Sequence, residues 1–192
     1  GLLLIFSFVM APPALAGEPM DIVKENVNTV LEVLRDPALQ GPENKEKKRE
    51  KARKIVNDRF DFEEISRRSL GRHWTERSEE EKKEFVEIFS EFLERSYMNR
   101  IEGHTADEVL FLSEEIRGGK AEVRTKAVTE KGTEVPINYR LFKKNGRWMV
   151  YDVVIEGVSL VSSYRTQFNE IIRGSSYEGL VKSLREKLER EG

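Results

Sequence analysis

Residues 146–172 read GRWMVYDVVIEGVSLVSSYRTQFNEII, and this stretch decides the fold. Its first part predicts a strand with apolar side chains on both faces: Trp148, Val150 and Val154 on one, and Met149, Tyr151, Val153 and Ile155 on the other. A strand of this kind has to be covered on both sides. Its second part predicts an amphipathic helix with an apolar stripe at Leu160, Val161, Tyr164, Phe168, Ile171 and Ile172. We therefore expect a strand, a bend and a helix that share a large apolar lining.

Three further strands precede this one. The predicted strands cover 109–116, 121–130, 133–144 and 147–155, and the dipeptides Gly118-Gly119, Lys131-Gly132 and Asn145-Gly146 separate them. Such dipeptides are typical of hairpin turns, and short connections indicate an antiparallel meander. A two-residue turn at Asn145-Gly146 places Leu141 opposite Val150, Tyr139 opposite Asp152 and Ile137 opposite Val154. On this register Asp152 is the one acidic residue on an apolar face.

Helices account for most of the remaining chain. Apolar residues at helical spacing predict helices over about 21–34, 45–60, 61–70, 78–101 and 159–173, and a last one from about residue 176. Asp61 with Glu64, and Ser78 with Glu81, are capping boxes, and Ser159 is the expected N-cap of the helix after the bend. The predicted fold class is α+β, with a four-stranded antiparallel meander and about six or seven helices.

The composition is that of one domain of ordinary size. The 192 residues are 35% charged and 38% hydrophobic, with a net charge of −2. A nucleic-acid-binding domain is usually basic, so this balance gives no support for that class. The absence of cysteine excludes disulfides, thiolate catalysis and cysteine-ligated metals. His73 and His104 have no second ligand at a metal-binding spacing, so we expect no metal site and no cofactor.

The N-terminus predicts export from the cytoplasm. Leu2 to Val9 is an apolar run too short to span a bilayer, and Ala14-Leu15-Ala16 is a small-x-small cleavage signal. We expect residues 1–16 to be a signal peptide that lacks its basic n-region, and residues 17–192 to form a single domain. The alternative is that the apolar run is a buried strand or helix of the fold.

A basic run lies between residues 45 and 54. It holds seven lysines or arginines against Glu46 and Glu50. Two interpretations stay open: a contact with an anionic surface or partner, or the solvated face of an ordinary helix. This face is the first candidate for a partner-binding surface.

The sequence contains no catalytic motif. It has no phosphate-binding loop, and the segment around Ser159 lacks the second glycine of a nucleophile elbow. Tyr139, Asp152 and Arg165 are the candidates for a polar cluster near the apolar lining. Buried charge is normally paired, which favours a structural Tyr–Asp–Arg network. The alternative is a small-molecule enzyme that uses Asp152 and Tyr139 as an acid–base pair.

Six segments carry a resemblance to a known family. They are Trp148-x-Val150-Tyr151-Asp152-Val153, Glu156-Gly157-Val158-Ser159-Leu160-Val161, Tyr164-Arg165-x-Gln167-Phe168, Phe60-Asp61-Phe62, Ser69-Leu70-Gly71-Arg72-x-Trp74 and the helix from Phe85 to Tyr97. Together they resemble the MlaC family of periplasmic phospholipid-binding proteins, also called the toluene-tolerance family. The resemblance covers essentially the whole mature chain.

The resemblance implies a soluble, monomeric carrier and not an enzyme. It implies a deep apolar pocket between a curved sheet and helices, which holds phospholipid acyl chains as cargo. The implied partners are an outer-membrane lipoprotein complex and an inner-membrane ABC transporter bearing an MCE protein. The implied role is to shuttle lipid between them in the periplasm and so maintain outer-membrane lipid asymmetry. Carriage of hopanoids or other lipids is the alternative within the family.

The expected pocket lining consists of aromatic and aliphatic side chains in contact with acyl chains. Simple core packing is the alternative for each of them. They are Leu70, Trp74, Phe89, Leu93, Tyr97, Ile101, Tyr139, Leu141, Trp148, Val150, Val154, Val158, Val161, Tyr164 and Phe168. Asp152 and Arg165 are candidates for contact with the headgroup or for a structural polar cluster.

Overall fold

The structure is a computed structural model that describes residues 18–191, except residues 104, 105, 107 and 130. The expected signal peptide at residues 1–16 and His104 lie outside the described residues. Among the helices that are described, none combines the length and the hydropathy needed to cross a bilayer.

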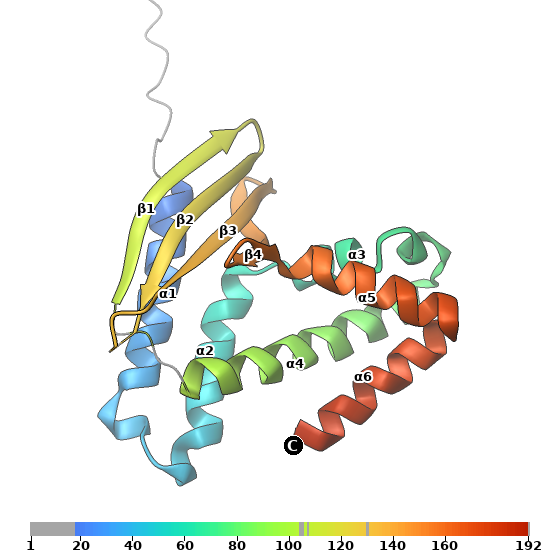
Figure 1. Cartoon of the computed structure of the whole chain (residues 1–192), viewed down its shortest axis with the longest axis horizontal. Coiled ribbons are helices and arrows are strands. Elements are labelled where there is room, and N and C mark those ends of the chain that lie inside the picture. The colour runs from blue at the N-terminus through green and yellow to red at the C-terminus, as the bar shows by residue number, and fades with distance from the viewer. Residues whose placement is uncertain (1–17, 104–105, 107, 130, 192) are drawn as a thin grey trace, which may run out of the picture.

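An antiparallel sheet forms one half of the molecule (Figure 1). Its strands are β1 (Glu108–Arg117), β2 (Lys120–Val128), β3 (Glu134–Lys144), β4 (Arg147–Ile155) and β5 (Val158–Ser159). They are ordered β1-β2-β3-β4-β5, so the predicted meander and the α+β class are confirmed. The fifth strand was not predicted, because two residues are too short to show an alternating pattern.

A β-bulge between β3 and β4 changes which side chains share a face. Leu141 lies opposite Val150, as predicted, but Arg140 lies opposite Asp152 and Tyr139 opposite Val153. Tyr151 is the extra residue, and one extra residue reverses the alternation of every side chain beyond it. The predicted pairings of Tyr139 with Asp152 and of Ile137 with Val154 are therefore wrong.

The bulge aligns apolar side chains on one face of β2, β3 and β4. The register aligns Val123 with Tyr139 and Val153, and Thr125 with Ile137 and Ile155. Trp148 and Val150, which precede the bulge, lie on this same face, whereas Val154 lies on the opposite one. The predicted wall of Trp148, Val150 and Val154 is wrong for Val154.

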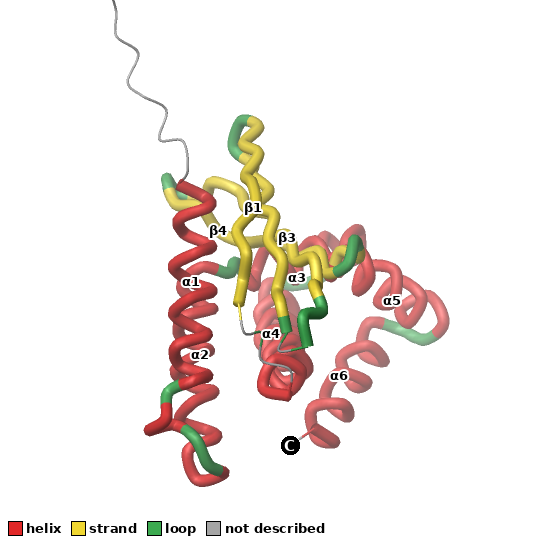
Figure 2. Tube along the Cα trace, turned by 60° about the vertical axis from the view of Figure 1, so that its left-hand side comes forward, coloured by secondary structure: helices red, strands yellow, loops and turns green. Residues whose placement is uncertain are grey.

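Two antiparallel helices cover one part of that face. They are α1 (Glu18–Arg35) and α2 (Lys45–Arg59), joined by short 3₁₀ turns at Pro37–Leu39 and Pro42–Asn44. The two helices pack against each other, and they overlap at the left of Figure 2. Val23 of α1 is buried in one cluster with Val123, Leu141 and Trp148 of the sheet. The Trp148 indole N–H donates to the Glu18 carboxylate at 3.2 Å. The sheet face left uncovered by α1 is the part near Ile137 and Ile155.

The remaining helices form a second layer with its own core. They are α3 (Phe62–Leu70), α4 (Glu79–Gly103), α5 (Leu160–Gly174) and α6 (Tyr177–Glu191), and a 3₁₀ segment, Gly71–Glu76, follows α3. Their core is aromatic: the Phe89 ring meets those of Tyr164 and Phe168 edge-on, at 5.1 and 5.0 Å between centroids. Six α-helices agree with the predicted number.

The helix N-termini follow the predicted caps. The Asp61 carboxylate accepts from the Glu64 N–H at 2.9 Å. Ser78 and Glu81 exchange two hydrogen bonds, of 2.7 and 3.1 Å, as a capping box does. The Ser159 hydroxyl accepts from the Ser162 N–H at 3.1 Å and begins α5. These local interactions fix where each helix leaves its neighbouring strand or turn.

Candidate functional site

A cavity of about 570 Å³ lies between the sheet and helices α2, α3, α4 and α5. Fourteen of its 21 lining residues are aliphatic, aromatic or methionine. They are Val56, Phe60, Phe62, Ile65, Leu93, Tyr97, Met98, Ile137, Tyr139, Val153, Ile155, Leu160, Val161 and Tyr164. The polar members are Arg53, Asn57, Ser69, Ser90, Glu91, Glu94 and Asp152. A space of this size and lining suits an apolar ligand.

The sheet wall of the cavity follows from the bulge at Tyr151. Ile137 and Tyr139 of β3 line the cavity together with Val153 and Ile155 of β4, which are their partners across the ladder. Without the extra residue, Asp152 and Val154 would stand beside Tyr139 and Ile137. The bulge thus places the Val153 isopropyl group opposite Tyr139, where the unbulged register would place the Asp152 carboxylate.

The α2–α3 junction closes another side. Phe60 and Phe62 line the cavity with their rings stacked at 6.2 Å. The Asp61 N–H between them donates to the Val150 carbonyl of β4 at 2.9 Å, and its carboxylate accepts from Lys144 at 2.6 Å. These bonds hold the junction against β4, so the two rings keep their place on the wall.

An ion pair bridges α2 and α4 where both helices line the cavity. The Arg53 guanidinium lies 2.6 Å from the Glu94 carboxylate. The hydrogen bond to Glu94 raises the pKa of Arg53, although partial burial opposes that shift. The Arg53 side chain is still 43% exposed, so this part of the cavity lies near the solvent.

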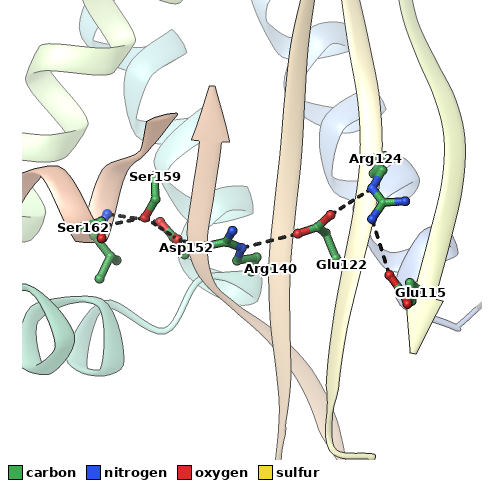
Figure 3. A network of polar contacts seen from close by, with 8 residues as sticks. Glu115, Glu122, Arg124, Arg140, Asp152, Ser159 and Ser162 are labelled. Carbon is green, nitrogen blue, oxygen red and sulfur yellow. Dashed lines mark hydrogen bonds and ion pairs between the residues drawn. The ribbon is translucent and has the colours of Figure 1, made fainter. Parts of the chain in front are cut away.

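Asp152 ties the sheet to the start of α5 (Figure 3). Its side chain is only 3% exposed and accepts from Arg140 at 3.1 Å, from the Ser159 hydroxyl at 2.7 Å and from the Val161 N–H at 3.1 Å. Arg140 continues the network to Glu122, at 3.4 Å, on the neighbouring strand. Asp152 therefore serves as a structural anchor that sets the position of Val161 on the cavity wall.

Tyr139 brings a phenol to the cavity wall. Its hydroxyl has no hydrogen-bond partner among the residues that the structure describes. Burial raises the pKa of Tyr139 to about 12, so the phenol keeps its proton at neutral pH. The Ser69 hydroxyl is also buried without a described partner, and Ser69 lines the cavity. Tyr139 and Ser69 are thus two hydroxyl donors on the cavity wall that the described residues leave unpaired.

The structure brings part of the predicted lining set together at this cavity. Leu93, Tyr97, Tyr139, Val161 and Tyr164 line it, as does Asp152. Leu70, Phe89 and Phe168 are buried in the core of the helical layer, with Trp74 packed against that core. Leu141, Trp148 and Val150 are buried between the sheet and α1.

Three other predicted residues lie away from the cavity. Val154 is buried on the opposite face of the sheet, where it pairs with Ser159. Val158 is 58% exposed, because it precedes the cap of α5 at the edge of the sheet. Arg165 donates to the Ser162 hydroxyl at 3.1 Å, and its stem meets Gly71 rather than Asp152. The side chain of Ile101 lies outside the described residues.

The predicted polar cluster of Tyr139, Asp152 and Arg165 does not form. Arg140, one residue along from Tyr139, takes the place of Arg165 beside Asp152. The described residues contain no group of His, Asp and Glu side chains that could hold a metal ion. His73 instead shares a hydrogen bond of 3.0 Å with the Asn169 side chain.

Many lining residues that the sequence did not assign come from α2, from α3 and from Phe60 between them, and four others come from α4. The apolar side of α2 showed in the sequence as Ile55, Val56 and Phe60, but nothing there indicated what it would face. Val153 and Ile155 were expected on the other face of β4. When both faces of a strand are apolar, the sequence does not show on which face each side chain lies, so it cannot reveal a bulge.

Comparison with known proteins agrees with the fold and the cavity. The family model described as MlaC protein matches residues 24–186 of this chain, which confirms the resemblance predicted from its sequence. Among solved structures, a phospholipid-binding protein from Ralstonia solanacearum, determined in complex with a phospholipid, is similar with a TM-score of 0.79. The two sequences are 27% identical, and the match covers 89% of this chain and 97% of that one.

Proposed function

The chain belongs to the MlaC family, and we propose that it is a lipid carrier that holds phospholipid acyl chains in the cavity. The single observation that carries this proposal is the cavity of about 570 Å³ with its largely apolar wall. The similar Ralstonia protein, which was determined with a phospholipid, supports the choice of ligand.

The volume of the cavity sets how much hydrocarbon it takes. A cavity of about 150 Å³ holds benzene, or roughly 25 Å³ per carbon. At that density a space of 570 Å³ takes about 20 carbons, which is more than one acyl chain and less than two. Two long chains therefore require the helices to move apart or the chain ends to lie in the mouth.

The energetics suit a carrier. Burial of a methylene is worth about 0.8 kcal/mol, so about 20 carbons gain roughly 16 kcal/mol relative to water. Transfer from a membrane into an apolar cavity exchanges one apolar environment for another and is nearly neutral. The headgroup stays at the mouth, because a buried and unpaired phosphate is costly. The sequence has no phosphate-binding loop, so the direction of transport comes from the partners.

We further propose where and with whom the protein works. Residues 1–16 are its signal peptide, residues 17–192 are its single domain, and the periplasm is its compartment. It shuttles lipid between an outer-membrane lipoprotein complex and an inner-membrane ABC transporter bearing an MCE protein, which maintains outer-membrane lipid asymmetry. The family membership and the apolar run before Ala14-Leu15-Ala16 support these assignments.

An enzyme that uses Asp152 and Tyr139 as an acid–base pair has less support. The Asp152 carboxylate already accepts three hydrogen bonds from the protein. Tyr139 has a pKa of about 12 and no described hydrogen bond to Asp152. An acid–base pair needs mutual contact and pKa values near the working pH.

Native mass spectrometry of protein purified without detergent tests the carrier. We expect bound phospholipid, and we expect delipidated protein to take up phospholipid from vesicles. Chemical identification of the extracted lipid separates phospholipid from hopanoid. Empty protein that takes up no lipid from vesicles would contradict the proposed function.

A further inference from the structure

Helix α2 concentrates positive charge in a protein that is otherwise acidic. Between Lys45 and Arg59 it carries eight basic and three acidic side chains, a net charge of +5. The whole chain has a net charge of −2, so the other residues together carry −7. The carrier function does not require this asymmetry, because α2 contributes to the cavity through Arg53, Val56 and Asn57.

Three of the five lysines of α2 form a row on its outer side. Lys47, Lys51 and Lys54 follow i, i+4, i+7 spacing, which places them on one face of a helix, and all three are exposed. Lys47 and Lys51 make no ion pair with any residue that the structure describes. Lys54 lies 3.0 Å from Glu50, but both side chains are more than half exposed, and such pairs contribute little.

The chemistry of the row fits a lipid surface better than a protein surface. Protein interfaces are depleted in lysine and enriched in aromatic residues, methionine and arginine, and the row contains none of these. Anionic bilayers, in contrast, attract clustered lysines through their diffuse negative potential, without shape complementarity. The exposed face of α2 also lacks the large apolar side chains of a helix that inserts into the interface.

We propose that the lysine row of α2, Lys47, Lys51 and Lys54, docks the protein on the surface of an anionic lipid bilayer. The contact is electrostatic and reversible, because no apolar anchor accompanies it. Each lysine near such a surface strengthens binding about fivefold, so three contribute about 100-fold at low ionic strength.

The lysine row lies on a helix that also forms one wall of the cavity. Arg53 and Asn57, which line the cavity, lie on the same helix about a third of a turn from the lysines. Arg53 and Asn57 are exposed, so the cavity is close to the solvent at this helix. A bilayer seated on the lysine row therefore lies beside the α2 wall of the cavity, within reach of a lipid that enters or leaves there.

Co-sedimentation with vesicles tests the proposal. The probes are vesicles of phosphatidylcholine alone and of an equimolar mixture with phosphatidylglycerol. We expect binding of the full-length mature protein to the anionic vesicles only, and loss of that binding when salt shortens the Debye length to about 3 Å. The variant with Lys47→Glu, Lys51→Glu and Lys54→Glu should bind about 100-fold more weakly or not at all.

A matched variant separates this surface from a general charge effect. Lys120→Glu, Lys131→Glu and Lys182→Glu change the net charge equally, at three exposed lysines outside α2. This control should keep most of the binding, and circular dichroism should show both variants folded. Equal loss in the two variants, no binding to anionic vesicles, or equal binding to both kinds of vesicle would overturn the proposal.

Two further outcomes are decisive. Retention on an acidic polypeptide column without any binding to vesicles would overturn the proposal in favour of a protein partner. Vesicle binding is measured independently of the lipid inside the protein. A protein that docks through α2 but carries no lipid would refute the carrier function and leave the docking surface standing.

Discussion

Substitutions at two adjacent valines of β4 test whether the cavity holds a ligand or is filled by side chains. Val153 lines the cavity and is half-buried, whereas Val154 is buried on the opposite face of the sheet, away from the cavity. Replacement of either valine by Trp adds the same seven heavy atoms at neighbouring positions. The two variants therefore differ only in what the larger side chain meets.

The volume of the cavity sets how much lipid-binding free energy Val153→Trp should lose. At roughly 25 Å³ per carbon, seven added atoms occupy about 170 Å³, close to a third of the 570 Å³ available. Room for about seven methylenes of cargo is lost. At about 0.8 kcal/mol each, this weakens lipid binding by up to about 5 kcal/mol, or 10³- to 10⁴-fold. The fold itself has space for the indole, so its stability should change little.

Val154→Trp has the opposite profile. Val154 is buried and does not line this cavity, so the added atoms overpack its site and cost about 1–3 kcal/mol of folding free energy. Lipid binding by the fraction that remains folded should be close to that of the wild type. The pair thus predicts one loss of binding and one loss of stability at adjacent positions.

Two measurements check this prediction. Native mass spectrometry after incubation with phospholipid vesicles gives the bound lipid, and urea unfolding of the delipidated proteins gives the free energy of unfolding. If Val153→Trp loses as much stability as Val154→Trp, the region is a filled core. If it carries as much lipid as the wild type, the acyl chains lie somewhere else.

Three further predictions follow from single contacts. Asp152→Ala removes a buried acceptor of three hydrogen bonds and should lower the free energy of unfolding by about 3 kcal/mol, measured by urea unfolding. Glu122 belongs to the same network but its side chain is only partly buried, so Glu122→Ala should cost less than about 1 kcal/mol in the same measurement. Asp61→Ala removes the cap of α3 and should cost about 1–2 kcal/mol, measured in the same way. Because burial raises the pKa of Tyr139 to about 12 from an ordinary value near 10, the unfolded state loses this proton first. The free energy of unfolding should therefore fall by about 2–3 kcal/mol as pH rises from 10 to 12. Tyr139→Phe should abolish that part of the fall. If the variant and the wild type lose the same stability between pH 10 and 12, the phenol is not buried.

Much of the fold is predictable because it rests on local interactions. The turn at Asn145-Gly146 and the capping boxes at Asp61 and Ser78 involve residues within a few positions of one another. Their residue types have few alternatives, so the sequence indicates both the hairpin and the two helix starts. The meander and the helix boundaries follow from such signals.

The bulge at Tyr151 is not predictable from the local sequence pattern. Leu141 pairs with Val150 as the turn predicts, and the pairing then shifts by one residue at Arg140. The shift brings Asp152 opposite Arg140, where it also caps the start of α5, and gives Tyr139 an apolar partner. Those contacts join residues from two strands and a helix. The hydrophobic pattern along a single strand carries no information about such contacts.

The division between core and cavity wall also depends on tertiary structure. Phe89 and Leu93 lie one turn apart on the apolar stripe of α4, yet Phe89 is buried against α5 while Leu93 lines the cavity. Hydrophobic periodicity identifies the side chains of a helix that face away from water. It is the same whether those side chains pack in a core or line a space that holds lipid. What distinguishes them is what each side chain meets: Phe89 packs against rings of α5, whereas Leu93 faces a space that α2, α3 and the sheet also border.

Photo-crosslinking with a phospholipid that carries a diazirine near the end of one acyl chain tests the central claim most directly. After loading and irradiation, peptide mass spectrometry locates the residue that the acyl chain touches. The cavity predicts crosslinks within β3, β4 and α5, on residues such as Ile137, Val153 and Tyr164. Crosslinks confined to the outer surface, or a loaded protein whose cavity residues remain unmodified, would contradict the claim that this space holds the acyl chains.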